Sequence, residues 1–210
     1  MEIEYYGANC FKVATKKANL VFDDNLVELG LNSVTKNGDI ALFSMAHHEP
    51  SAEVKLIINQ PGEYEVSGVS IQGIAARGHM DEPKQTTVTI FKTIADDIRI
   101  VSVGHIYPEL SDEQLEALGT VDVLFIPVGG SGYTLDGVGA LKVIKKIEPK
   151  MVIPTHYEDS KIKYTVPQQS LDDAIKALAM EPRERVGKLK LKPDDMMLIE
   201  GTKLVILERQ

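Results

Sequence analysis

The sequence predicts a mixed α/β protein with one domain, residues 1–210, in which two β-sheets are sandwiched between helices. Three observations predict this fold class. Strand patterns dominate the first half of the chain, strands alternate with amphipathic helices in the second half, and no linker or low-complexity segment separates the halves. Because 43% of the residues are hydrophobic, a chain of this length can bury a sizeable core.

The first half contains short runs of β-branched and aromatic residues between Gly, Asp and Pro turn residues. Gly7 marks a turn or bulge in the first run, and Asp23-Asp24-Asn25 ends the second. The predicted strands cover residues 3–13, 20–22, 39–44, 55–58, 64–66, 69–75, 86–92 and 99–103.

The second half adds helices. Ser111 and Gln114 have the spacing of a capping box, which predicts a helix that ends at Gly119. Apolar spacing predicts a helix over 135–147, and a second capping pattern predicts another over 170–180. Further strands are expected at 121–128, 151–154, 189–191 and 203–207. Two strand-rich stretches, each followed by helices, favour two sheets over a simple parallel βαβ array.

The composition argues against several functional classes. The chain has 23 Lys+Arg against 31 Asp+Glu, a net charge of −8, which argues against general nucleic-acid binding. The single cysteine, Cys10, excludes an internal disulfide framework and a thiolate-rich zinc site. No apolar run suits a signal peptide or a bilayer span, so we expect no membrane attachment and a cytoplasmic location.

All histidines of the chain follow predicted buried strands. Loops at strand ends are where rigid scaffolds place chemistry, and imidazole is both a common metal ligand and an acid–base group. The histidines are His47 and His48 after residues 39–44, His79 after 69–75, His105 after 99–103, and His156 after 151–154. Their repeated placement favours convergence on one site.

Two carboxylates, Glu49 and Asp81, lie next to these histidines and are further candidates for ligands or for groups that orient a ligand. His48, taken alone, is interpreted as an ordinary exposed or hydrogen-bonded loop residue.

Several segments, in order along nearly the whole chain, resemble the metallo-β-lactamase superfamily, in its branch of small zinc-dependent hydrolases. They include residues 6–11 (YGANCF), 61–65 (PGEYE), 122–130 (DVLFIPVGG) and 152–157 (VIPTHY). The resemblance implies an αββα four-layer sandwich with a metal site at one edge of the two sheets. It also implies a small-molecule substrate and self-association into a homo-oligomer.

The metal-binding signature of that family, His-x-His-x-Asp-His, is degenerate here. Aligned at the preceding Ser44, this chain has Met-Ala-His-His-Glu-Pro over residues 45–50. Only His47 matches, and Glu49 is a longer carboxylate in place of Asp. Met45 and Pro50 replace imidazoles, although proline offers no ligand and a thioether binds zinc poorly.

Later ligand positions are changed as well. His79 is the candidate for the histidine that the branch carries after the strand at 69–75. His105 takes the position of the bridging Asp, and His156 matches the last ligand. Ala8 stands where the branch commonly has His, and Pro108 where it has a trailing His. Measured against the family's ligand pattern, these changes imply that the two-metal arrangement is lost.

The first hypothesis is a remodelled hydrolase with one zinc or other divalent ion per chain and metal-bound hydroxide as the attacking group. Glu49 or Asp81 would act as base or orienting group, and the substrate would be an ester, lactone or phosphodiester. The proposed ligands are His47, His79, His105 and His156.

Two alternatives stay open. One is a catalytically inactive, metal-free member that acts as a binding or scaffolding protein. The other is a metal-free acid–base site built from His47, His105 and His156.

Overall fold

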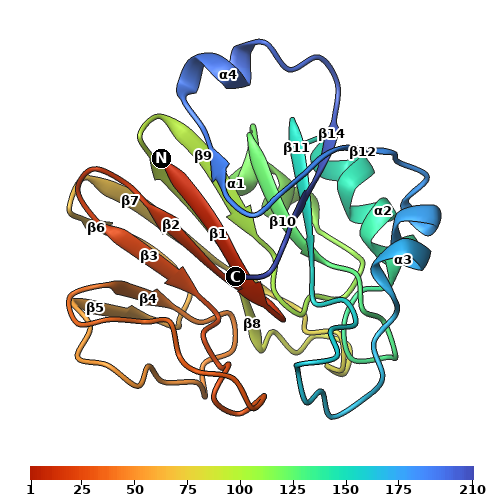
Figure 1. Cartoon of the computed structure of the whole chain (residues 1–210), viewed down its shortest axis with the longest axis horizontal. Helices are drawn as coiled ribbons and strands as arrows, with labels where there is room; N and C mark the ends of the chain where they lie inside the picture. Colours follow the sequence, from red (N-terminus) through yellow and green to blue (C-terminus); the bar gives the residue numbers. More distant parts are fainter.

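Two β-sheets pack face to face in the computed structural model, which covers residues 1–210 (Figure 1). The six-stranded sheet has the order β13-β1-β2-β3-β4-β5, and the eight-stranded sheet has the order β12-β14-β11-β10-β9-β8-β7-β6. The strands of the first sheet are β1 (Glu2–Gly7), β2 (Cys10–Ala14), β3 (Asn19–Phe22), β4 (Ile40–Leu42), β5 (Leu56–Ile58) and β13 (Leu189–Lys190).

The eight-stranded sheet holds the remaining strands. They are β6 (Gly62–Val66), β7 (Val69–Ala76), β8 (Val88–Ala95), β9 (Ile98–Ser102), β10 (Val123–Pro127), β11 (Met151–Thr155), β12 (Pro182–Val186) and β14 (Lys203–Leu207). Each sheet contains a parallel part: β3, β4 and β5 in the first, and β9, β10, β11, β14 and β12 in the second. The loops that follow parallel strands leave a sheet at one edge, so each sheet gathers such loops at one end.

Aromatic stacking links the two sheets across the main core. The Phe11 ring of β2 stacks on Phe22 of β3 at a centroid distance of 4.3 Å, and on Phe125 of β10 in the other sheet at 3.6 Å. All three side chains are buried. Their burial follows from the alternation of inward and outward residues along each strand.

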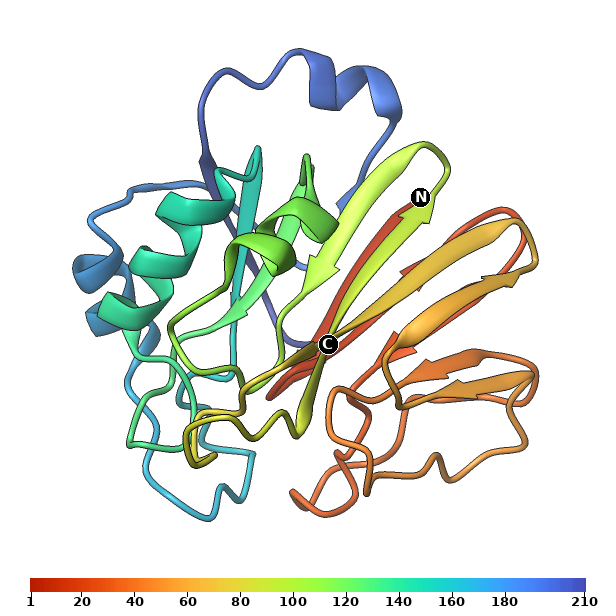
Figure 2. The same ribbon diagram turned by 180° about the vertical axis from the view of Figure 1, so that it is seen from behind.

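Three helices cover the outer face of the eight-stranded sheet: α1 (Asp112–Leu118), α2 (Gly137–Ile147) and α3 (Leu171–Leu178) (Figure 2). Ser111 caps α1 in a capping box with Gln114, as predicted, and Ser170 caps α3. Asp136 caps α2, so that helix begins two residues later than expected. These caps satisfy amide groups that a helix cannot pair internally.

The predicted fold class is confirmed, but the outer face of the six-stranded sheet is covered by coil and turns rather than by a helix. Residues 23–38 cross this face, where Leu26 packs with Cys10 and Val21 in a small cluster. Asp24 organises the segment, because its Oδ2 accepts hydrogen bonds from the backbone and hydroxyl of Thr35. A carboxylate that satisfies loop amides in this way competes with helix formation.

Two elements are not predicted from the sequence. Helix α4 (Pro193–Met197) is five residues long, too short to show a helical period. Strand β12 has mostly exposed side chains and therefore lacks an apolar alternation. In addition, the predicted strand 3–13 divides into β1 and β2 around Ala8 and Asn9, since Gly7 and Ala8 adopt positive φ angles of 110° and 46°. None of the helices has the length and hydropathy needed to cross a membrane.

Candidate functional site

A small pocket lies where loops from both sheets meet. Its lining comes from the turn after β1, the loops after β3 and β4 in one sheet, and the loops after β9 and β11 in the other. The cavity measures about 10 Å³, enough for one water molecule or one ion. The lining residues are Ala8, Asn9, Asp23, Asn25, Ser44, Met45, His48, His105 and His156.

Close packing and strained backbone hold these loops together. Gly104 precedes His105 with φ 58°, and a Cβ there would lie 2.6 Å from the Cβ and Oγ of Ser44, which belongs to the other sheet. Ala8, Asp23 and His156 also have positive φ angles, between 45° and 53°. Non-glycine residues in this region cost free energy, and such residues often occur at functional sites.

His156 follows β11 directly and is anchored twice. Its backbone N–H donates to the carbonyl of Ala8 at 2.7 Å, and its Nδ1 lies 3.0 Å from Oε1 of Gln168. The amide oxygen can only accept, so Nδ1 carries the proton and Nε2 keeps a free lone pair. Burial of the ring lowers the pKa of His156 to about 4. The imidazole is therefore neutral at pH 7.

His48, in the loop after β4 of the other sheet, has a similar arrangement. Its Nδ1 lies 3.1 Å from Oε1 of Glu28, and its ring lies 4.1 Å from the ring of His47, centroid to centroid. Burial and the neighbouring His47 lower the pKa of His48. A carboxylate that accepts from Nδ1 leaves Nε2 as the free nitrogen, which is the usual orientation of a metal-binding histidine.

His105 lies between Asn9 and His156 and is half-buried. Its ring stands edge-on to His156 at 4.7 Å. The Nε2 atom accepts from Nδ2 of Asn9 at 3.2 Å, and Asn9 is oriented by Thr155, whose Oγ1 donates to Oδ1 at 2.8 Å. Nδ1 of His105 has no side-chain hydrogen-bond partner. Burial and the neighbouring His156 hold the pKa of His105 well below its ordinary value.

Asp23 supplies the only carboxylate in the pocket. Its Oδ1 accepts the backbone N–H of Ser44 at 2.6 Å, whereas its Oδ2 is buried without a partner. Burial raises the pKa of Asp23 to about 6. This carboxyl group can therefore take up or release a proton near neutral pH.

The structure brings together only part of the predicted ligand set. His105 and His156 line the pocket, but the side chain of His47 is exposed and lies against His48 with its ring tilted by 44°. His79 lies one loop away, half-buried, with its Nδ1 3.3 Å from the carbonyl of Ile106. Its backbone N–H donates to the carbonyl of His105, so the two side chains come from paired segments.

The two predicted carboxylates do not line the pocket. Glu49 is exposed. Asp81 stabilises its own loop, where its carboxylate accepts from the backbone of Gly78 and from the backbone and hydroxyl of Thr87. Although burial opposes it, these hydrogen bonds hold the pKa of Asp81 below its ordinary value.

Sequence reasoning missed His48, Asp23 and Asn9 as pocket residues. Asp23 could have been found, because it directly follows a buried strand, in the same way as the histidines. His48 could not be separated from His47 by position in the chain alone. The turn after β4 decides which of the two adjacent imidazoles is buried.

No group of three His, Cys, Asp or Glu side chains is arranged to hold a metal ion as the side chains stand. The donor types nevertheless suit one divalent ion: the free Nε2 atoms of His48 and His156 and the unpartnered Oδ2 of Asp23. Side-chain movement would be needed to bring them to one point. The pocket has neither the volume nor a second carboxylate for two ions.

Comparison with known proteins agrees with this architecture. The family model described as a beta-lactamase superfamily domain matches residues 2–156, a range that contains every pocket residue. UPF0173 metal-dependent hydrolases from Salinibacter ruber and Thermoplasma volcanium are 23% and 25% identical to this chain, each over 75% of it. The alignments cover 85% and 83% of those proteins, respectively.

Solved structures show the same fold. One is a Thermotoga maritima protein assigned to the Zn-dependent hydrolases of the metallo-β-lactamase superfamily. It superimposes with a TM-score of 0.75 at 26% identity, covering 99% of both chains. Igni18, a metallo hydrolase from Ignicoccus hospitalis, has a TM-score of 0.64 at 16% identity, with 99% of this chain and 94% of that chain covered.

Proposed function

The chain belongs to the β-lactamase superfamily, and on that basis we propose that it is a metal-dependent hydrolase whose pocket binds one divalent ion. One observation carries the proposal. His48 and His156, contributed by different sheets, each have Nδ1 held by an acceptor and Nε2 free beside the same cavity. This pairing of an oriented imidazole with an outer acceptor is typical of metal ligands.

The proposed ligands are His48, His156 and Asp23. His105 could be a fourth ligand if the hydrogen bond between Nδ2 of Asn9 and Nε2 of His105 were broken. This set keeps two of the histidines expected from the sequence and replaces His47 and His79. An ion held there would act as a Lewis acid that polarises the substrate and lowers the pKa of water. The names of the relatives, which are metal-dependent hydrolases, support this choice.

The protein's own groups have defined tasks in the proposal. Glu28 and Gln168 orient the rings of His48 and His156. Asp23, whose pKa burial raises to about 6, can hold a proton on Oδ2 or accept one there, as general acid–base chemistry requires. The substrate is a small ester, lactone or phosphodiester.

The second candidate is a metal-free member with a binding or scaffolding role. The arrangement around His105 favours it, because Thr155 orients Asn9 so that its amide donates to Nε2 of His105. That hydrogen bond occupies a lone pair a metal would need. The chain of hydrogen bonds from Thr155 through Asn9 to His105 is complete without an ion.

Metal stoichiometry separates the two candidates. The protein would be purified without a histidine tag, stripped with chelator, and titrated with zinc, manganese and iron(II), with elemental analysis after desalting. We expect about one equivalent per chain, together with thermal stabilisation. Hydrolysis would then be assayed on ester, lactone and phosphodiester substrates with the loaded protein.

Matched histidine variants test the ligand set. His48→Gln and His156→Asn should lose bound metal and its thermal stabilisation, whereas His47→Gln and His79→Gln should retain both. Loss in the His47 or His79 variant alone would overturn the proposed ligands. Two equivalents per chain would contradict a mononuclear site, and no binding by the folded wild-type protein would favour the metal-free candidate.

A further inference from the structure

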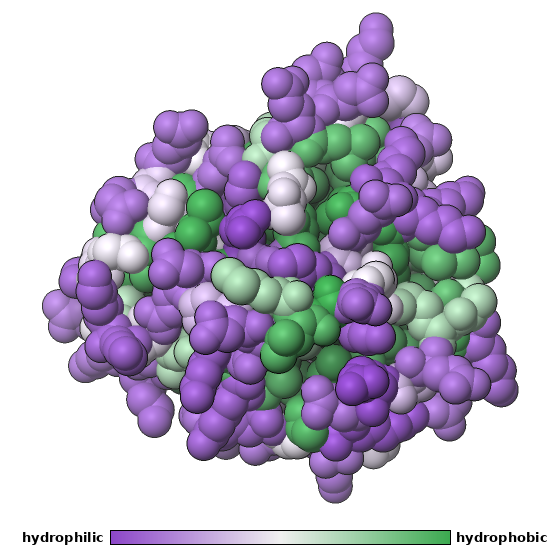
Figure 3. Space-filling view, turned by 90° about the horizontal axis from the view of Figure 1, so that it is seen from above, coloured by the Kyte–Doolittle hydropathy of each residue, from purple (hydrophilic) through white to green (hydrophobic).

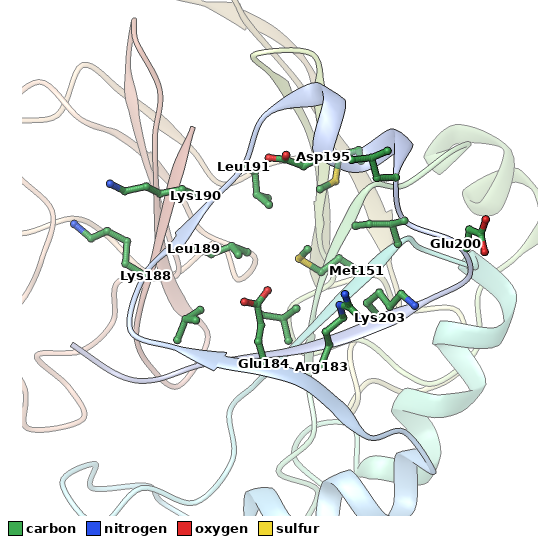
Figure 4. A pocket seen from close by; sticks show the side chains of 15 residues that line it. Met151, Arg183, Glu184, Lys188, Leu189, Lys190, Leu191, Asp195, Glu200 and Lys203 are labelled. Carbon is green, nitrogen blue, oxygen red and sulfur yellow. The ribbon is translucent and has the colours of Figure 1, made fainter.

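A second cavity, of about 550 Å³ and shown in Figure 4, is lined by residues at the end of the sandwich opposite the histidine pocket. Met151, the first residue of β11, lines this cavity, whereas His156 follows the last residue of the same strand. Strands β12 and β13 and helix α4 border the cavity. Its volume lies in the range of small-molecule sites, about 300–1,000 Å³.

The floor of this cavity is apolar. It consists of side chains of the main core that reach the surface at this end of the molecule: Met151, Leu189, Leu191, Met196 and Val205. Seen from this end, hydrophobic surface lies among hydrophilic residues (Figure 3). An apolar floor of this kind favours a ligand with an apolar body.

One wall of the cavity carries both signs of charge. A register shift in the pairing of β12 with β14, between Pro182 and Glu184, places two neighbouring residues, Arg183 and Glu184, at the cavity. In a regular strand they would face opposite sides. The close view shows the side chain of Arg183 between those of Glu184 and Lys203 (Figure 4).

These three charged groups form no ion pair, unlike the nearby cations Lys188 and Arg185. Lys188 lies 2.8 Å from carboxylate oxygens of both Glu2 and Glu4. Arg185, on the same strand as Arg183, pairs with Asp172 at 3.5 Å.

Two other carboxylates line the cavity. Asp195 accepts the backbone N–H of Lys192 at the start of α4. Glu200 lies at the far rim, away from the wall formed by Arg183 and Glu184 (Figure 4). Glu200 likewise forms no ion pair, whereas Arg183, Glu184 and Lys203 come from the neighbouring strands β12 and β14 and line one wall of the cavity.

We propose that this cavity binds a small zwitterion with an apolar side chain, of which a free apolar α-amino acid is the simplest. Its carboxylate would contact Arg183 and Lys203, its ammonium group Glu184, and its side chain the apolar floor. A fatty acid could pair its carboxylate with Arg183 and Lys203 but would leave Glu184 unpaired, and an alkylamine could pair with Glu184 but would leave both cations unpaired. A zwitterion pairs with all three groups.

Binding would be measured by calorimetry and by NMR with L-leucine, L-phenylalanine and L-methionine on the full chain. Octanoate and octylamine serve as probes with one charge and a comparable apolar part. We expect saturable binding of at least one of the amino acids at one site per chain, and binding of octanoate and octylamine about tenfold weaker or undetectable.

Variants on the charged wall locate the site. Arg183→Gln and Glu184→Gln should each weaken amino-acid binding about tenfold. Arg185→Gln is the matched control, because Arg185 is an exposed cation on the same strand that does not line the cavity. Thermal unfolding of each variant confirms that it is folded. Unchanged binding in Arg183→Gln and Glu184→Gln would overturn the proposal, as would octanoate binding as tightly as the amino acids or no binding of any amino acid.

Discussion

The two ends of this sandwich differ in what fills them. At one end, loops after parallel strands bring three imidazoles and a carboxylate around a cavity of about 10 Å³. At the other end, about 550 Å³ lies over an apolar floor. The histidine end has crowded backbone, with positive φ angles at Ala8, Asp23, Gly104 and His156.

The contrast shows two ways to build a site on one scaffold. Dense hydrogen bonding at the histidine end holds side chains in fixed orientations and leaves almost no free volume. The opposite end keeps its volume because short elements, β13 and α4, border the core without filling it. Mutations should therefore affect folding strongly at the first end and weakly at the second.

Of the paired variants, two glycine substitutions should show the largest difference between the ends in the free energy of unfolding that is lost. Gly104 and Gly201 have similar φ angles, 58° and 65°. A Cβ on Gly104 would meet Ser44 at 2.6 Å, whereas a Cβ on Gly201 would meet nothing within 4 Å. Gly104→Ala should lower the free energy of unfolding by about 3 kcal/mol and Gly201→Ala by about 1 kcal/mol, because both incur the left-handed backbone cost and only the first adds overlap.

Denaturant unfolding of both variants at neutral pH would test this comparison. Equal losses would mean that the structure around Gly104 and Ser44 can shift to accommodate the added methyl group. The close packing at the histidine end would then contribute little to the free energy of unfolding.

The free energy of unfolding should depend on pH because of the buried histidines at the histidine end. Burial depresses the folded-state pKa values of His105 and His156, the latter to about 4. Their contribution to stability is therefore present above the ordinary histidine pKa of about 6.5 and is lost as the pH falls toward 4. Burial raises the pKa of Asp23 to about 6. Protonation of Asp23 therefore stabilises the folded protein as the pH falls below 6, which opposes the effect of the histidines.

Two histidines outweigh one aspartate, so the metal-free protein should lose on the order of 2 kcal/mol between pH 7.5 and pH 5. Chelator-treated protein would be unfolded in denaturant at both values. The loss should shrink in His156→Asn, because that variant lacks one of the buried imidazoles. Asparagine is the replacement because it tolerates the left-handed backbone of that position. A free energy of unfolding that stays constant over this range would show that the imidazoles are not held neutral by burial.

Two threonine variants, one at each end, should show the smallest difference in the free energy of unfolding that is lost. Thr155→Val removes the hydroxyl that orients the buried Asn9, and should lower the free energy of unfolding by about 2 kcal/mol because a buried acceptor is left unpaired. Thr202→Val removes a hydrogen bond to the carbonyl of Pro149 at the other end. Thr202 is only half-buried, so water can replace the lost donor and the cost should be about 0.5 kcal/mol.

Chemical denaturation would also compare these two variants, and the metal content of Thr155→Val should be measured alongside. A larger loss for Thr202→Val would contradict the view that polar contacts at the histidine end are the more tightly constrained.

Local sequence determined most of the secondary structure. The capping pairs at Ser111 and Ser170 act within one helical turn, so they predict α1 and α3 without knowledge of the rest of the fold. The parallel strands β10 and β11 are fully buried and therefore appear as continuous apolar runs. The placement of histidines after strands likewise indicated the end of the molecule where His105 and His156 meet.

Tertiary structure alone decided which side chains share the pocket. His47 and His48 are neighbours in the chain, yet one is exposed and the other is buried beside Glu28, 20 residues earlier. Asn9 reaches His105 across 96 positions. The cavity at the other end depends in the same way on a strand bulge beside β14 and on an α4 too short to predict. Local propensity acts within a turn of helix or a few strand residues, whereas each of these contacts depends on packing between distant segments.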